Sequence, residues 1–136
     1  MEKADYNIVS VTKALQLIDL LSRKNGQLSV QALAEKLDVS PSNVTRLLQT
    51  MRDAGFVEKS PKTNRYLLSN KFYVVTSNML YSNECIQKYL PVAQRVAAKL
   101  NATVALNSLY GKNAVMLARA GGFSRTGDFS VGNMSP

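Results

Sequence analysis

The chain has 136 residues, of which 46% are apolar and 19% charged, and its net charge of +8 gives a pI near 9.8. This length allows one domain, or one small domain and part of another. The basic balance suits nucleic acid, a membrane surface or an acidic protein as a partner. The longest apolar runs fall far short of the roughly 18 residues that span a bilayer, and the polar start MEKADYN is not a signal peptide. We therefore expect a cytoplasmic protein without a membrane partner.

The side chains that usually carry catalysis are scarce in this sequence. Histidine, the commonest general base and metal ligand, is absent. The single cysteine, Cys85, has no histidine partner and no second cysteine for thiol catalysis or zinc binding. No glycine-rich phosphate loop is present either. The sequence therefore predicts a protein that is not an enzyme and that uses no metal and no cofactor, and its one cysteine fits a reducing cytoplasm.

The first 55 residues predict three short helices. Ser10 is a candidate cap for a first helix that begins at Val11, and Asn25 with Gly26 would end it. Spacing of three and four residues predicts its inward stripe, which comprises Val11, Ala14, Leu15, Ile18 and Leu21. Ser29 caps a second helix, whose inward residues are expected to be Val30, Leu33, Ala34 and Leu37.

The third helix follows the second after a tight turn at Asp38 and Val39. Ser40 is its cap, and a proline at the next position is a strong start signal for a helix. The helix is expected over 41–54 and stops at Gly55, the favoured residue for a left-handed helix end. Its apolar stripe has the spacing of a helix packed on a core and comprises Val44, Leu47, Leu48 and Met51.

A short hairpin is predicted directly after the third helix. The runs 56–59 and 65–68 are compatible with strands, and 60–64 between them is rich in turn residues. Three helices and a hairpin make a complete small domain over residues 1–69.

A linker helix is expected over 70–83. Its apolar residues extend around more of the helix than packing within one chain would bury. Phe72, Val75 and Met79 are therefore candidates for a dimer interface. A helical segment over 84–100 follows, in which Pro91 either causes a kink or starts a fresh helix. The apolar stripe expected after this proline comprises Val92, Val96 and Leu100.

From Thr103 the apolar period changes to that of strands, which predicts a second hairpin with its turn at 110–113. A short strand through Val131 would close the chain. The predicted fold class is mainly α with β-hairpins (α+β), and 84–136 hold too few elements for an independent core. We therefore expect 84–136 to be the N-terminal part of an incomplete domain.

The third helix has a polar face that suits DNA reading. Together with the second helix and the turn it predicts a helix-turn-helix, and such a helix fits the major groove. The guanidinium of Arg46 suits guanine, whereas Asn43 or Gln49 would pair with adenine. Thr45 would touch a thymine methyl or a phosphate. Ser40, with the free amides of the helix start, suits a phosphate.

The predicted hairpin behaves as a basic wing. Residues 40–71 hold six basic residues and two acidic ones, as phosphate binding requires. The basic residues of the wing and its flank are Lys59, Lys62, Arg65 and Lys71. Duplex DNA is the favoured partner of this unit, and the alternatives are RNA, a protein partner or a scaffold without a ligand.

Three stretches of the chain resemble the IclR-type transcriptional regulators. They read VTKALQLIDLLS, LSVQALAEKLDVSPSNVTRLLQTMRDAGFVEKSPKTNRYLLS and ECIQKYLPVAQRVAAKLNATVAL, in the same order along the chain. The resemblance implies a winged helix-turn-helix, a linker helix and a GAF-like effector-binding domain. Carried over by position, Ser42, Asn43, Thr45 and Arg46 would read DNA, with Lys62 and Arg65 on the wing.

The resemblance also implies partners. Such regulators bind double-stranded operator DNA as dimers or tetramers and respond to small metabolites, often organic acids. The chain stops where members of the family continue through most of their effector domain, so either it is a fragment or the protein has lost its sensing half. We expect an effector to bind weakly, if at all, to these 136 residues, because a pocket needs further elements to enclose a ligand.

Overall fold

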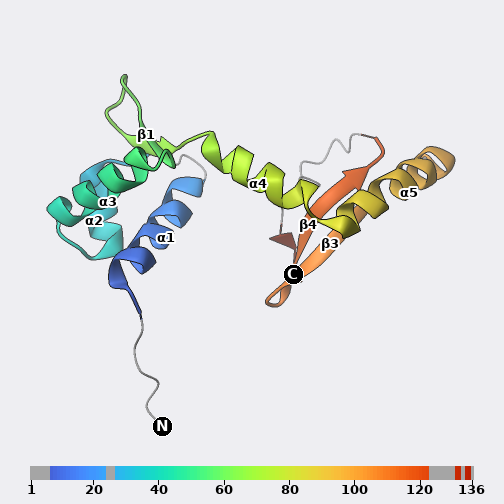
Figure 1. Cartoon of the computed structure of the whole chain (residues 1–136), viewed down its shortest axis with the longest axis horizontal. Coiled ribbons are helices and arrows are strands. Elements are labelled where there is room, and N and C mark those ends of the chain that lie inside the picture. Colours follow the sequence, from blue (N-terminus) through green and yellow to red (C-terminus); the bar gives the residue numbers. More distant parts are fainter. Residues whose placement is uncertain (1–6, 24–26, 123–130, 133, 136) are drawn as a thin grey trace, which may run out of the picture. The chain divides into compact units, whose positions relative to one another are not determined.

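The computed structural model describes residues 7–23, 27–122, 131–132 and 134–135. The chain forms two compact units, Met1–Val74 and Val75–Pro136. Helices and short antiparallel strands occur in both units, so the α+β class is confirmed (Figure 1).

The first unit contains three helices followed by a two-stranded hairpin, in the predicted order. Its strands are antiparallel, with Val57 opposite Leu68. The elements are α1 (Val9–Ser22), α2 (Val30–Leu37), α3 (Pro41–Asp53), β1 (Val57–Lys59) and β2 (Tyr66–Leu68).

One apolar cluster holds these five elements together. Each element contributes at least one buried side chain, and burial of a large aliphatic side chain stabilises the fold by about 1.5–3 kcal/mol. The cluster comprises Leu17, Leu21, Leu33, Ala34, Leu37, Val44, Leu48, Met51, Val57 and Tyr66. The inward residues predicted for α2 and α3 belong to this cluster or pack against it.

The prediction for the first helix was wrong in two respects. The residue before α1 is Ile8, which gives no side-chain cap, so Ser10 lies inside the helix. Of the predicted stripe, Leu21 is buried and Ala14 and Ile18 pack against the apolar cluster. Val11 and Leu15 are instead 52% and 59% exposed, and Leu17 is buried. The helix is apolar on more than one side, and its packing against α2, α3 and β2 selects the buried side. It ends at Ser22, and the predicted end at 25–26 lies outside the described residues.

The caps predicted for α2 and α3 are confirmed. The hydroxyls of Ser29 and Ser40 each accept a backbone N–H of the helix that follows. Asp38 ends α2 in the left-handed conformation, with φ of 51°. Gly55, with φ of 80°, follows the C-cap Ala54 of α3. Because Ser40 and Pro41 mark the start of α3 and Gly55 marks its end, the sequence defines the helix to within one residue.

The second unit is built on a three-stranded antiparallel sheet. Its strand order is β3-β4-β5, and α5 packs against β3 and β4. The elements from the predicted linker onward are α4 (Lys71–Tyr81), α5 (Glu84–Leu100), β3 (Val104–Tyr110), β4 (Asn113–Ala120) and β5 (Met134–Ser135). The boundary between the two units falls inside α4. The domain limits 1–69, 70–83 and 84–136 stay predictions.

The stripe predicted for the helix after Pro91 was wrong. That proline lies inside one continuous helix, α5, so no fresh helix begins there. Val92, Val96 and Leu100 are 50%, 37% and 69% exposed. The buried positions are instead Ala93 and Ala97, which pack with Ala120 of β4. The small alanine side chains let the helix approach the sheet closely. The sequence analysis expected the larger and more hydrophobic side chains of this helix to be the buried ones.

The predicted last strand is also displaced. Val131 lies in a turn, and the terminal strand is β5, while 123–130 lie outside the described residues. Across the described ranges no helix is both long and apolar enough to cross a membrane.

Candidate nucleic-acid interface

The second and third helices form a helix-turn-helix. The turn between them is tight because the Asp38 N–H bonds back to carbonyls of α2 and the Val39 N–H donates to Ala34 O at 3.2 Å. The two helices then contact each other through the apolar cluster of the first unit. This packing fixes α3 on the unit by one side and leaves its other side exposed.

The exposed side of α3 has a continuous polar stripe. Val44, Leu48 and Met51 are buried. Residues spaced by four, three and four positions share the opposite side of the helix. We call these four residues the outward stripe: Ser42, Arg46, Gln49 and Asp53, all exposed. Three predicted reading residues, Ser42, Arg46 and Gln49, therefore lie on one line along the helix.

The hydroxyl groups at the start of α3 are already engaged within the helix. Ser40 Oγ accepts the Asn43 N–H at 3.4 Å and shares a 3.0 Å hydrogen bond with Ser42 Oγ. Thr45 Oγ1 donates to Pro41 O at 2.9 Å. These bonds position the helix start, where the positive end of the helix dipole favours an anion. The lone pairs and methyl group of Thr45 remain available to a ligand.

The side chain of Gln49 has a partner that the sequence analysis missed. Gln49 Nε2 donates to Asp53 Oδ1 at 2.7 Å. The signal was present in the sequence, because Gln and Asp four residues apart on a helix form a known stabilising pair. Gln49 is therefore restrained before any partner binds.

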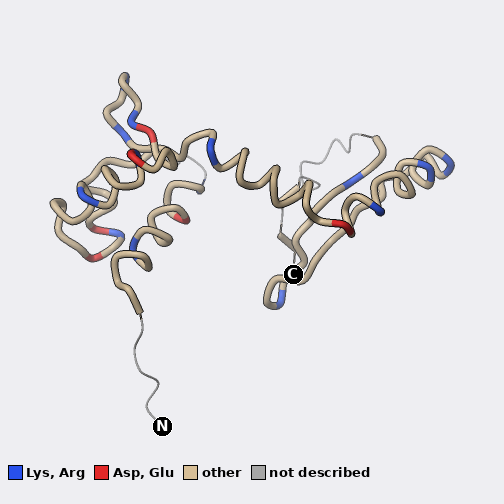
Figure 2. Tube along the Cα trace, in the orientation of Figure 1, with Lys and Arg blue, Asp and Glu red and all other residues tan. Residues whose placement is uncertain are grey.

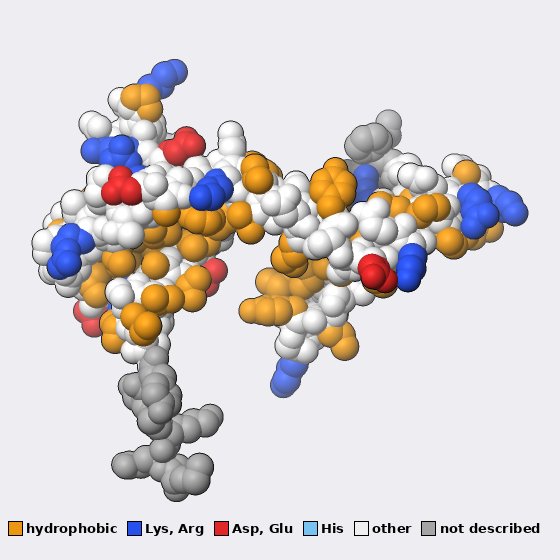
Figure 3. Space-filling model, viewed as in Figure 1, with side chains coloured by type: hydrophobic (Ala, Val, Ile, Leu, Met, Phe, Trp, Pro, Cys, Tyr) orange, Lys and Arg blue, Asp and Glu red, His pale blue; other side chains and the backbone are white. Residues whose placement is uncertain are grey.

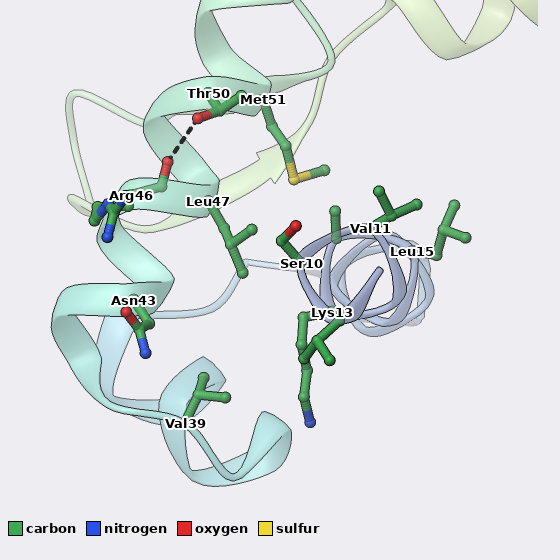
Figure 4. Close-up of a pocket in the computed structure, with 12 residues that line it drawn as sticks. Ser10, Val11, Lys13, Leu15, Val39, Asn43, Arg46, Leu47, Thr50 and Met51 are labelled. Atoms are coloured by element: carbon green, nitrogen blue, oxygen red, sulfur yellow. Dashed lines mark hydrogen bonds between the residues drawn. The ribbon is translucent and has the colours of Figure 1, made fainter. Parts of the chain in front are cut away.

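A groove of about 570 Å³ separates one side of α3 from α1 (Figure 4). Asn43 and Arg46 line it from α3, and the exposed apolar residues Val11 and Leu15 line it from α1. Lys13 also lines the groove, but its Nζ donates to Leu37 O at 2.6 Å, at the C-terminal end of α2. Arg46 thus lies where the outward stripe borders this groove.

The wing is held in place by backbone hydrogen bonds at its tip and at its base. At the tip Ser60 N donates to Arg65 O at 2.8 Å, and Asn64 adopts a positive φ of 55°. At the base Leu28 and Tyr66 exchange two backbone hydrogen bonds of 3.1 and 2.9 Å. Lys62 and Arg65 are both exposed, and Figure 2 shows the basic residues of this hairpin.

Lys71 has a different role from the other basic residues of the region. Its Nζ donates to Ala54 O at 2.6 Å and lies 4.4 Å from the ring centroid of Phe56. The Phe56 ring also meets Phe72 of α4 edge to face, with 5.3 Å between centroids. Lys71 therefore joins the start of α4 to the end of α3. The sequence carried no signal for this contact, because its partner is a backbone carbonyl brought close by the fold.

The structure brings the predicted site residues together in two groups on the first unit. One group lies in and just before α3 and comprises Ser40, Ser42, Asn43, Thr45, Arg46 and Gln49. The other, Lys62 and Arg65, lies in the wing between β1 and β2. Figure 3 shows basic side chains on this unit among polar and apolar ones.

Three helices with a hairpin after the third define the class of winged helix-turn-helix domains. Residues 10–61 match the family model of the IclR helix-turn-helix domain. This match, together with similar proteins that are themselves IclR-type regulators, identifies a helix-turn-helix domain of the IclR type in the chain.

Individual relatives agree with this assignment. The chain is 25% identical over 99 residues to the acetate operon repressor of Salmonella typhimurium, which covers 73% of this chain and 36% of the relative. It is 27% identical over 108 residues to the DNA-binding transcriptional repressor YiaJ of Escherichia coli, covering 79% and 38%. The crystal structure of an IclR family regulator from Brucella abortus matches with a TM-score of 0.80 and 20% identity, over 100% of this chain and 52% of that one. The chain thus spans little more than a third of the length of these two curated relatives.

Proposed function

We propose that this protein is a sequence-specific, DNA-binding transcriptional regulator of the IclR type. The observation that carries the proposal is the exposed polar side of α3, which is held on the domain core by its other side and is followed by a basic wing. A helix placed in this way can enter the major groove while its apolar stripe stays buried.

Each predicted residue has a proposed contact on the DNA. Arg46 donates to O6 and N7 of guanine, and Asn43 or Gln49 pairs with adenine. Thr45 touches a thymine methyl or a phosphate, and the α3 start at Ser40, with Ser42, receives a phosphate. The support for these assignments is the exposure of the side chains and their position in the first turns of α3.

On the wing, Lys62 and Arg65 contact phosphates without reading sequence. Support comes from their exposure, Lys62 within the turn at 60–64 and Arg65 directly after it. The alternative of an RNA-binding or protein-binding winged helix is not favoured, because the curated relatives are named as repressors, one of them as DNA-binding.

The remaining partners follow from the family resemblance. The proposal includes a homodimer or homotetramer, a cytoplasmic location and a small effector, with an organic acid as its class. The second unit, with α5 packed on its sheet, would belong to the effector-binding part.

Selection from random duplex DNA tests the proposed function. We expect the full chain to enrich one sequence and to bind it with strong salt dependence, measured by fluorescence anisotropy at several salt concentrations. A scrambled duplex and an RNA hairpin serve as competitors. Lys88→Ala is the control for the loss of one basic residue outside the proposed interface. Lys88 is an exposed residue of the second unit, where it pairs with Glu84. Failure to enrich any duplex sequence, or tighter binding to the RNA, would contradict the proposal.

A further inference from the structure

The position of Asp53 is unexpected on the surface proposed to meet DNA. It is the last residue of α3 and continues the outward stripe beyond Gln49. A carboxylate at a helix C-terminus is repelled by the helix dipole. On this side of the helix it would also be repelled by phosphates. Neither the stability of the helix nor a general affinity for DNA therefore accounts for an acidic residue here.

The contact that Asp53 makes is with a residue proposed to read a base. Gln49 Nε2 donates to Asp53 Oδ1 at 2.7 Å, and both side chains are exposed. An ionised carboxylate only accepts hydrogen bonds, so the amide nitrogen of Gln49 must be the atom that faces it. Asp53 forms no ion pair within the described part of the chain. The second amide hydrogen and the Oε1 atom of Gln49 remain available to a base edge.

A restrained glutamine suits the recognition of adenine. Bidentate pairing needs the amide oxygen at N6 and the amide nitrogen at N7, in a fixed orientation. A free glutamine loses side-chain entropy when it is ordered. A glutamine that is already held in place loses less entropy when it binds. More of the free energy of its pairing with adenine therefore contributes to affinity.

We propose that Asp53 is a positioning residue that sets base specificity through Gln49. It holds the amide for pairing with adenine, and its charge weakens binding to every duplex, so that tight binding depends on the correct bases. This inference rests on the proposed function, because it requires α3 to lie in the major groove.

Two substitutions at Asp53 separate its charge from its hydrogen bond. Asp53→Asn keeps an acceptor for Gln49 but removes the charge, and we expect about two- to fivefold tighter binding to all duplexes with the adenine preference kept. Asp53→Ala removes both, and we expect the adenine preference at one position per half-site to fall by roughly three- to tenfold. Asp53→Lys also lacks an acceptor and serves if the alanine variant is poorly folded, which circular dichroism reveals.

The base preference of each variant is measured on the sequence that the wild-type chain selects, with all four bases at each position. In a Gln49→Ala background, Asp53→Ala should cause no further loss of preference. Glu58→Gln is the matched control, because Glu58 is the other acidic residue of 40–71 and is exposed on β1. It should strengthen binding to all duplexes and leave the base preference unchanged.

Wild-type preference in both Asp53→Ala and Asp53→Lys, or additive losses in the double variant, would overturn the role of Asp53 while leaving the proposed function intact. A wild-type chain that selects no sequence would overturn both.

Discussion

Arg46 is the residue on which most of the proposed recognition depends. It lies in the middle of the outward stripe, where its side chain is exposed and borders the groove between α1 and α3. Its backbone carbonyl accepts Thr50 Oγ1 at 3.0 Å, so the helix around it is well ordered by local bonds. Arginine presents a planar set of donors that fits the two acceptors of guanine, a geometry that lysine cannot reproduce.

Replacement of Arg46 should therefore affect specificity more than general affinity. We expect Arg46→Ala to weaken binding to the selected sequence by about 1–3 kcal/mol and to relax the preference at one position per half-site. Arg46→Lys is the control, because it keeps the charge and removes the bidentate geometry. Binding titrations against duplexes substituted at each position make the comparison. Wild-type preference at every base in the alanine variant would show that Arg46 does not read DNA.

At the scale of single residues, the sequence predicted which side of α3 is exposed but not how its side chains are bonded. Val44, Leu48 and Met51 are buried as their spacing requires. The bond from Gln49 to Asp53 follows a known helical spacing and was open to prediction.

The wing is an element whose basic residues should act without regard to sequence. We expect Lys62→Ala and Arg65→Ala to weaken binding to selected and scrambled duplexes alike. The slope of log affinity against log salt should become shallower by about one unit for each phosphate that the variant no longer neutralises. Lys112→Ala is the control, because Lys112 is an exposed residue in the turn between β3 and β4. Weaker binding to the selected sequence alone would indicate that the wing reads bases.

The junction between α3 and α4 depends on Lys71. Replacement by methionine keeps the aliphatic stem but removes the hydrogen bond to Ala54 O and the cation above the Phe56 ring. We expect Lys71→Met to lower the free energy of unfolding by about 1 kcal/mol, measured by urea denaturation. Lys112→Met is the matched control and should have little effect. An unchanged unfolding midpoint for Lys71→Met would mean that this contact does not stabilise the unit.

The elements show where periodicity is sufficient and where it is not. In α3 one side is apolar and the other polar, so the buried side is unambiguous. In α1 several sides are apolar, and tertiary packing selects Leu17 in place of Leu15. In α5 the residues buried after Pro91 are the small Ala93 and Ala97, which pack with Ala120 of β4. Local patterns thus predicted every element except the last strand, and only the packed fold determines the rotation of α1 and α5.

At the scale of the whole molecule, α4 carries the exposed apolar surface that we propose for self-association. No residue of this helix is buried, and Tyr73, Val75 and Met79 are 75%, 46% and 67% exposed. Phe72 is half-buried, because its ring packs against Phe56 in the same chain. Of the predicted interface residues, Val75 and Met79 are therefore the more available to a second copy.

A charge in this surface should separate the protomers. We expect Met79→Asp to shift the protein from dimer to monomer in sedimentation velocity, because an unpaired carboxylate in an apolar interface is costly to desolvate. Asn78→Asp introduces the same charge at a neighbouring polar position that is also exposed, and it should remain dimeric. A folded Met79→Asp variant that stays dimeric would exclude this part of α4 as the interface.

The backbone bridge between Leu28 and Tyr66 allows hydrogen exchange at Leu28 to be used as a measure of whether the wing is attached to the helical domain. Leu28 lies between α1 and α2, yet its amide donates to Tyr66 O and its carbonyl accepts the Tyr66 amide. Amide hydrogens bonded in this way exchange with solvent only when the bond opens. Deuterium uptake at Leu28 therefore follows detachment of the hairpin from the helical domain, and its slowing on DNA would record how firmly the bound duplex holds the hairpin in place.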